Sequence, residues 1–204
     1  KVPDTIVSRT QHFEFSKISQ ADIISEVKKI AKKESLDLED EAARLIAFFA
    51  DGSLRAAQNI LYQAASFNNK IKESDLRLFL GAPSEELTNL ITSSLLKKES
   101  RNVISFIEEA FKNGINPKIL SRLILRNIKA VYFLKLDPLG KILKDEFSEE
   151  NIKFLSDLAG LISDIKFFDF AIRELLLSLE QRTDDYTAHI PLELALIKIA
   201  TQNS

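Results

Sequence analysis

The sequence predicts an all-α protein, in which a small three-helix unit is followed by a helical bundle and preceded by one short strand. Only five Gly and five Pro occur among the 204 residues, and residues that favour helices dominate the composition. From residue 19 onward, apolar residues recur at spacings of three and four, the period of an amphipathic helix. Phe13 and Phe15 stand at alternate positions and give the one strand signal in the chain. We expect that strand to belong to a sheet formed by an upstream part of the polypeptide.

Charge and composition argue against several classes of function. The 28 Lys and Arg residues and 30 Asp and Glu residues give a net charge of -2, which offers no general electrostatic case for nucleic-acid binding. The absence of Cys removes disulfides and thiolate zinc sites and fits a reducing cytosol. No apolar run approaches the ~20 residues of a membrane span, so the sequence predicts a cytoplasmic protein without a membrane partner. The start at Lys1 and the absence of Met predict an interior piece of a longer polypeptide.

Residues 19–80 predict the small helical unit, element by element. The first helix begins after Ser19, and the second covers about 39–50 and ends at the Asp51-Gly52 pair. Ser53 then caps a third helix with an apolar stripe, formed by Leu54, Ala57, Leu61 and Ala64. A short fourth element covers about 74–80.

Gly81-Ala82-Pro83 is the clearest candidate linker, and we predict a domain boundary there. Beyond it the pattern predicts six helices, at about 84–97, 100–112, 117–135, 148–163, 164–182 and 190–201. The helix that begins at Asn116-Pro117 is apolar around most of its circumference and should be buried on several sides. Two explanations of the abundant apolar surface stay open: it fills one bundle core, or part of it forms an interface between subunits.

The chain contains no complete active site. Its five Gly do not surround a Lys, so it has no phosphate-binding P-loop. His12 and His189 lie far apart without motif-spaced carboxylates, which gives a metal site little support. Adjacent carboxylates such as Glu108-Glu109 point to different helix faces and do not form an acid/base pair. We therefore expect the chain by itself to hydrolyse nothing.

Arg55 is the candidate binding residue. It falls in the first turn of the helix capped by Ser53, where a cation opposes the partial positive charge of the helix N-terminus at a cost of roughly 0.3–1 kcal/mol. An anion at that end would be stabilised by the backbone N–H groups and by the guanidinium, so the position favours a phosphate. The alternative is a solvated Arg whose stem lies on the helix surface.

Three segments together resemble the bacterial clamp-loader ATPases. Residues 5–15 read Thr-Ile-Val-Ser-Arg-Thr-Gln-His-Phe-Glu-Phe and are similar to the Thr-Ile-x-Ser-Arg-Cys-Gln-x-Phe-x-Phe segment that closes the ATPase core. Residues 51–57 read Asp-Gly-Ser-Leu-Arg-Ala-Ala and are similar to the second-sensor segment Asp-Gly-Ser-x-Arg-Asp-Ala. The tail 190–198 resembles the last collar helix of the tau/gamma subunits of DNA polymerase III. Thr10 and Ala56 depart from the family's Cys and Asp, and the second change bears on how Arg55 is oriented.

The resemblance implies an AAA+ ATPase subunit that couples ATP binding and hydrolysis to loading of the sliding clamp on primed DNA. It implies that residues 1–15 end the ATPase core, 16–82 form a helical lid domain and 83–204 form a collar that assembles the subunit ring. Arg9 would be the arginine finger that reaches the ATP of a neighbouring subunit, and Arg55 the sensor that touches its own ATP. ATP and Mg would bind the full-length parent, none is expected on this chain alone, and the partners would be tau/gamma, delta and delta-prime subunits.

Three alternatives to the tau/gamma assignment stay open. The delta-prime subunit shares the Ser-Arg segment, so the subunit type is less well defined than the family. A non-enzymatic helical adaptor would use its apolar faces to bind partner helices, with Arg9 and Arg55 as ordinary surface charges. Direct nucleic-acid binding is the weakest hypothesis given the net charge, and it would use Lys28, Lys29, Lys32 and Lys33.

Overall fold

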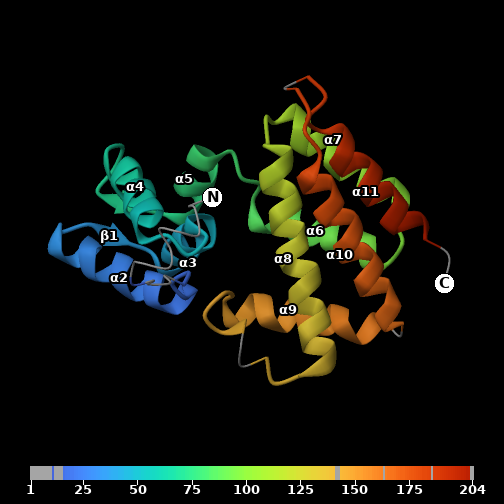
Figure 1. Ribbon diagram of the computed structural model, residues 1–204, viewed down its shortest axis with the longest axis horizontal. Coiled ribbons are helices and arrows are strands. Elements are labelled where there is room, and N and C mark those ends of the chain that lie inside the picture. Colours follow the sequence, from blue (N-terminus) through green and yellow to red (C-terminus); the bar gives the residue numbers. More distant parts are fainter. Residues whose placement is uncertain (1–10, 12–15, 141–142, 163, 185, 203–204) are drawn as a thin grey trace.

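The computed structural model describes residues 11, 16–140, 143–162, 164–184 and 186–202, and within them it contains ten α-helices and two two-residue strands. The helices form two groups joined by one connection (Figure 1). The N-terminal unit consists of α2 (Gln20–Lys33), β1 (Asp37–Leu38), α3 (Asp40–Ala50), α4 (Leu54–Ala65), β2 (Lys70–Ile71) and α5 (Glu73–Leu80). The C-terminal bundle consists of α6 (Glu85–Leu96), α7 (Ser100–Lys112), α8 (Pro117–Leu136), α9 (Glu149–Leu161), α10 (Ile165–Glu180) and α11 (Ile190–Thr201). The all-α prediction is confirmed.

Local sequence signals explain where the helices of the N-terminal unit begin and end. The Ser19 hydroxyl accepts a hydrogen bond from the Asp22 N–H at 3.1 Å and caps α2. At the end of α3, Asp51 adopts the left-handed conformation with φ 47°, and Gly52 follows with φ 82°. Inside the unit, α2, α3 and α4 bury one apolar cluster that includes Ile23, Ile46 and Leu61.

The parallel pairing of β1 with β2 joins the loop after α2 to the loop after α4. In this pairing Asp37 lies opposite Lys70 and Leu38 opposite Ile71. Sequence periodicity did not predict it, because a strand of two residues is too short to show an alternating pattern. The strand predicted at Phe13 and Phe15 lies outside the described residues.

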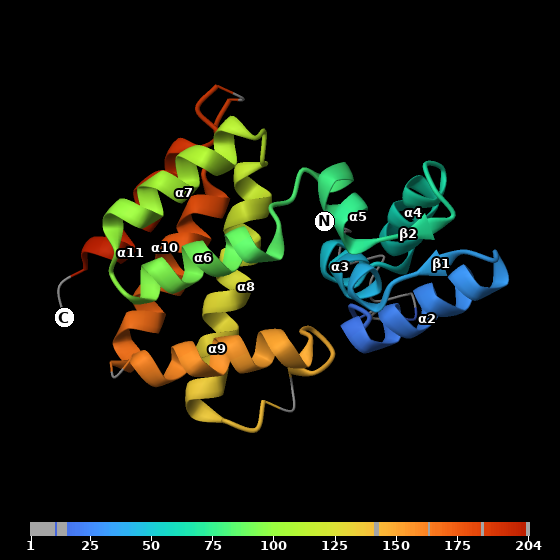
Figure 2. The ribbon, with the colours of Figure 1, turned by 180° about the vertical axis from the view of Figure 1, so that it is seen from behind.

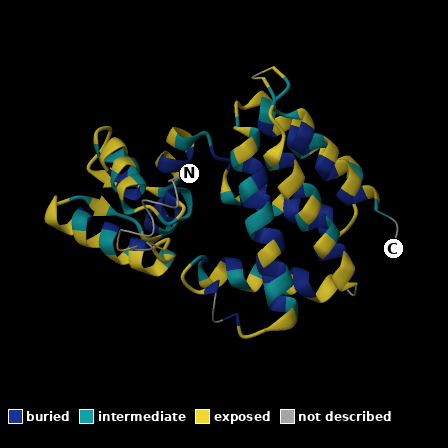
Figure 3. Ribbon diagram, viewed as in Figure 1, coloured by how far each residue is buried: buried dark blue, intermediate teal, exposed yellow. Residues whose placement is uncertain are grey.

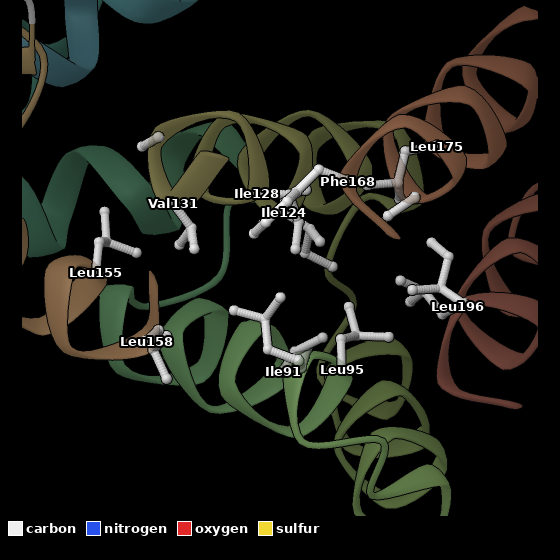
Figure 4. Packing of buried hydrophobic residues seen from close by; sticks show 14 of the residues in the cluster. Ile91, Leu95, Ile124, Ile128, Val131, Leu155, Leu158, Phe168, Leu175 and Leu196 are labelled. Atoms are coloured by element: carbon white, nitrogen blue, oxygen red, sulfur yellow. The ribbon is translucent and has the colours of Figure 1, made fainter. Parts of the chain in front are cut away.

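The C-terminal bundle is organised around α8, as its apolar circumference predicted. Asn116 caps the helix by accepting from the N–H groups of Lys118 and Ile119, and Pro117 occupies its first position. Side chains of α8 meet α6 on one side and α10 on the other (Figure 4). Buried residues follow the length of α8, whereas exposed residues cover the outer faces of the surrounding helices (Figure 3).

Gly81-Ala82-Pro83 connects the two groups of helices, and Figure 2 shows it running from α5 to α6. The connection is packed rather than open: Ala82 and Pro83 are buried, and the Pro83 carbonyl accepts a hydrogen bond from Arg77 Nη1 at 2.8 Å. The Gly81 carbonyl accepts from the Asn116 N–H at 3.0 Å, which ties the connection to the N-cap residue of α8. Each group of helices has its own apolar core cluster, whereas the predicted boundaries at residues 15 and 82 stay predictions. None of the described helices is long and apolar enough to cross a membrane.

Candidate functional site

Arg55 lies where the sequence predicted it, exposed in the first turn of α4. The helix begins after Ser53, whose hydroxyl accepts a hydrogen bond from the Ala56 N–H at 3.3 Å. Within the part of the chain that the structure describes, no hydrogen bond or ion pair engages the Arg55 guanidinium. A free cation therefore stands beside the N–H groups of a helix N-terminus, an arrangement suited to an anion.

The turn that precedes α4 is held in place by the segment Lys17-Ile18. Lys17 Nζ donates to Asp51 Oδ1 at 2.9 Å, and the Ile18 N–H donates to the Gly52 carbonyl at 3.1 Å. A Cβ added at Gly52 would lie 2.6 Å from the Lys17 Cβ, so glycine is required here both for its positive φ and for the close approach. The hydrogen bond from Lys17 lowers the pKa of the Asp51 carboxyl. The position of the α4 N-terminus is thus fixed by the chain that enters the unit.

None of the other candidate residues is placed beside Arg55 by the described part of the structure. Arg9 and His12 lie outside the described residues, so the structure leaves the predicted arginine finger untested. His189 stands at the start of α11 against Phe111, with ring centroids 5.7 Å apart. Among the described residues, no group of three His, Asp or Glu side chains could hold a metal ion.

Two of the four lysines of α2 are paired with carboxylates. Lys28 Nζ lies 2.8 Å from Asp40 Oδ1 and lowers the pKa of the Asp40 carboxyl, and Lys29 Nζ lies 3.1 Å from Glu26 Oε2. These carboxylates reduce the positive potential that a nucleic-acid backbone would need. The structure therefore adds nothing to the nucleic-acid hypothesis for this helix.

The sequence did not predict a largely buried cation, Arg126, between the two units. The Arg126 side chain of α8 is 12% exposed, and its Cζ lies 3.9 Å from the centroid of the Phe147 ring and 5.1 Å from that of Phe48. Burial lowers the pKa of Arg126 to about 10, and the nearby Glu146 carboxylate opposes that shift, so the group stays charged at neutral pH. No sequence signal could find this cluster, because Phe48 and Arg126 are far apart in the chain.

A polar cleft of about 440 Å³ lies where α5 meets α6 and α9. Glu73 and Arg77 line it from α5, joined by a hydrogen bond of 2.7 Å from Arg77 Nε to Glu73 Oε1. Glu85 and Asn151 line it from the bundle, and Asn151 Nδ2 donates to the Glu85 carboxylate. Burial, together with the nearby negative charge of Glu73, raises the pKa of Glu85.

Comparison with known proteins identifies relatives of this chain. Residues 22–70 match the family model described as the DNA polymerase III clamp loader subunit, ATPase lid domain. DNA polymerase III subunit tau of Bacillus subtilis (strain 168) is 31% identical over 159 residues, which are 77% of this chain and 28% of that protein. Subunit gamma of Buchnera aphidicola subsp. Schizaphis graminum is 29% identical over 160 residues, covering 78% of this chain and 44% of the relative.

Similarity also extends to plant proteins and to one solved structure. Protein STICHEL of Arabidopsis thaliana is 28% identical over 182 residues, covering 89% of this chain and 15% of that protein. The Bacillus subtilis DNA clamp loader delta protein superposes with a TM-score of 0.47 and 15% identity, covering 98% of this chain and 61% of that one. The chain thus spans 28% of that tau subunit, 44% of that gamma subunit and 15% of STICHEL, which is less than half of each.

Proposed function

Since the chain is a relative of the tau and gamma clamp-loader subunits of DNA polymerase III, with the ATPase lid domain in residues 22–70, we propose that it is part of a subunit that couples ATP binding and hydrolysis to loading of a sliding clamp on primed DNA. Residues 1–15 would end the ATPase core, 16–82 form the lid and 83–204 form the collar. The observation that carries the proposal is the exposed Arg55 in the first turn of α4, which pairs with none of the described residues and lies inside the segment that the lid family model matches.

Arg55 and the N-terminus of α4 fit the phosphates of ATP. The N–H groups of the first helical turn and the guanidinium are hydrogen-bond donors of the kind that phosphate oxygens accept. In this proposal Arg55 senses the ATP of its own subunit, and Arg9 contributes the arginine finger to the ATP of a neighbour. Both guanidinium groups would stabilise the negative charge that develops as the phosphoryl group is transferred. Mg ligands and the P-loop would come from the upstream ATPase domain.

The outer faces of α10 and α11 support assembly with other clamp-loader subunits. Six large apolar side chains are exposed on these two neighbouring helices: Ile165, Leu176, Leu177, Ile190, Leu194 and Ile197. Apolar side chains grouped on the surface of a helical bundle are typical of an interface between subunits. The clamp and the primed DNA would then be contacted by the whole assembly.

The test is the ATPase rate of the loader assembled from the full-length protein, stimulated by clamp and primed DNA. A positioned arginine at a transferring phosphoryl group is worth on the order of 10³-fold or more, so we expect Arg9→Ala to lose ~100-fold or more and Arg55→Ala ~10-fold or more. Arg101→Ala, at an exposed position of α7, is the control and should keep the wild-type rate. Wild-type rates in Arg9→Ala and Arg55→Ala, with assembly intact, would disprove the proposal.

A second candidate is a non-enzymatic adaptor that binds apolar partner segments. It is favoured by an apolar cavity of about 350 Å³ on the N-terminal unit, where the Phe67 and Phe79 rings lie 5.8 Å apart. Phe67 is 76% exposed and Leu78 is 84% exposed, which is unusual for side chains of this size. The same ATPase comparison separates the two candidates, because an adaptor would not depend on either arginine.

A further inference from the structure

The ring of Phe48, in the last turn of α3, lies against two cations of the C-terminal bundle. The Cζ atoms of Arg122 and Arg126 are 5.4 Å and 5.1 Å from the centroid of this half-buried ring. Both arginines belong to α8, and they stand four residues apart on the same face of that helix. An aromatic ring attracts cations to its faces, so these contacts hold the N-terminal unit against the bundle.

Arg126 also has contacts within the C-terminal bundle. Phe147 packs against its guanidinium with 3.9 Å between Cζ and the ring centroid, and the Glu146 carbonyl accepts a hydrogen bond from Nη2. The Glu146 carboxylate lies 4.0 Å from Nε. These partners come from the bundle itself and contact the cation independently of Phe48. We call Phe48, Arg122, Arg126 and Phe147 the Phe48 junction.

The Phe48 junction is continuous with the turn that carries Arg55. Three residues after Phe48, Asp51 binds Lys17, and the positive charge of Arg122 also contributes to lowering the pKa of Asp51. The next two residues are Gly52 and the cap Ser53, after which α4 begins with Arg55 in its first turn. The eight residues 48–55 therefore connect Phe48, which contacts the bundle, to Arg55, the candidate phosphate-binding residue.

Two separated contacts fix the orientation of the N-terminal unit. One is the covalent connection, where Arg77 donates to the Pro83 carbonyl at 2.8 Å and the Gly81 carbonyl accepts from the Asn116 N–H at 3.0 Å. A connection at one point would leave the unit free to rotate about it. The Phe48 junction supplies a second point of contact and restricts that rotation.

From this geometry we propose that Phe48, Arg122 and Arg126 are positioning residues, which couple the phosphate-binding end of α4 to the orientation of the C-terminal bundle. The coupling to ATP rests on the function proposed above for Arg55. The mechanical part, namely that the junction fixes how the two units are oriented, does not depend on ATP. The two parts can therefore be tested separately.

The mechanical part can be tested on the 204-residue chain by measuring a distance between the units. The chain has no Cys, so Ser25→Cys in α2 and Ser105→Cys in α7, both at exposed positions, accept one spin label each. Pulsed electron paramagnetic resonance then gives the distribution of distances between the labels. We expect Phe48→Leu and Arg122→Gln to broaden this distribution or shift its mean. Phe48→Tyr should keep the wild-type distribution, because it retains an aromatic face.

Phe133→Leu is the matched control, because Lys129 lies over the Phe133 ring at 5.2 Å and both residues belong to α8. It removes a cation–aromatic contact of the same kind without touching the N-terminal unit, and it should leave the distribution unchanged. Arg122→Gln keeps the test valid if Phe48→Leu does not fold. Distributions of wild-type width and mean in both Phe48→Leu and Arg122→Gln would overturn the proposal.

The coupling is tested by the stimulated ATPase of the assembled loader at saturating ATP. We expect at least a threefold loss in Phe48→Leu and Arg122→Gln, rescue in Phe48→Tyr, and the wild-type rate in Phe133→Leu. Wild-type rates in the junction variants beside a large loss in Arg55→Ala would overturn the coupling and leave the proposed function standing. A wild-type rate in Arg55→Ala would instead overturn the proposed function, and the coupling with it, whatever the distances show.

Discussion

The two groups of helices bury their cores with different side chains. In the N-terminal unit α3 contributes mainly alanines to the core, among them Ala42, Ala43, Ala47 and Ala50, which let neighbouring helices approach closely. In the C-terminal bundle α8 contributes large aliphatic residues, among them Leu120, Ile124, Ile128 and Leu134. Because apolar burial stabilises by roughly 25 cal/mol per Å², these residues of α8 gain more on burial than the alanines of α3 do.

The two groups of helices also differ in what they expose. The N-terminal unit carries the candidate binding residue, Arg55, whereas the C-terminal bundle supports that unit. The bundle surrounds α8 on several sides with buried apolar side chains. The N-terminal unit leaves the start of α4 exposed on a turn that contains two residues with positive φ, Asp51 and Gly52. Strained and exposed backbone of this kind commonly accompanies binding sites, and a large well-packed core can support it. Substitutions at three places, the bundle core, Gly52 and Glu85, test how far the contrast holds.

The largest effect is expected inside the bundle, where Leu196 is 0% exposed. Leu196→Asp places an unpaired carboxylate in an apolar core and should cost about 4 kcal/mol or more in the free energy of unfolding. Leu123→Asp in α8 should have a similar effect, since that side chain is also buried. Urea unfolding followed by circular dichroism measures the loss, and hydrogen exchange shows which helices lose protection.

Leu194→Asp provides the matched control, because this side chain lies two residues away on α11 and is 53% exposed. It should change the free energy of unfolding by less than ~0.5 kcal/mol. If Leu123→Asp and Leu196→Asp leave both the melting temperature and the assembly unchanged, the placement of the bundle core is wrong. If these two variants lose hydrogen-exchange protection equally in α2 to α5 and in the bundle, the two cores do not unfold as separate units.

An intermediate effect is expected at Gly52, in the turn of the N-terminal unit. Gly52→Ala must adopt φ 82°, and its Cβ meets the Lys17 Cβ at 2.6 Å unless the chain shifts. We expect a loss of about 1–2 kcal/mol, seen as a fall of about 3–6 °C in Tm.

Gly160→Ala, in the bundle, should increase stability rather than reduce it. Gly160 lies within α9, and a Cβ added there meets nothing within 4 Å. Alanine should therefore stabilise this helix by a few tenths of a kcal/mol. Equal effects of the two substitutions on Tm would show that the turn before α4 carries no special constraint.

The smallest effect is expected at Glu85, where the bundle meets the N-terminal unit. Its pKa is raised in the folded protein, so the folded state binds this proton more tightly than the unfolded state does. The contribution of this carboxyl to stability is therefore fully present below its unfolded pKa and is lost as the pH rises through its folded pKa. Glu85→Gln should remove that loss and raise Tm at pH 7 by about 1–2 °C, a small value because the group is partly exposed.

The pH dependence distinguishes this electrostatic effect from a change in packing. The gain in Tm of Glu85→Gln over wild type should shrink when the measurement is repeated at pH 4, where the wild-type carboxyl is largely protonated. Glu86→Gln at the neighbouring exposed position serves as the control. A gain that is the same at pH 4 and pH 7 would contradict a desolvated carboxylate at this position.

The sequence was sufficient for the parts of the fold that depend on local signals. Asn116-Pro117 marked the start of α8, and Ser53 marked the cap of α4, because these residues act on the backbone next to them. The place of Arg55 followed directly from that cap. Contacts between distant residues could not be found in this way. The β1–β2 pairing and the burial of Arg126 both depend on partners that only the folded chain brings together.

The hydrogen bond between the Gly81 carbonyl and the Asn116 N–H ties the N-terminus of α8 to the connection between the two units. The helix that begins there has 20 residues and is therefore about 30 Å long. Its other end packs against α9, on the far side of the bundle from this contact (Figure 1). By its length alone, a tilt of α8 by about 10° about its N-terminus would displace its far end by about 5 Å. The contacts at the two ends of α8 are therefore joined by the one helix that most of the bundle packs against.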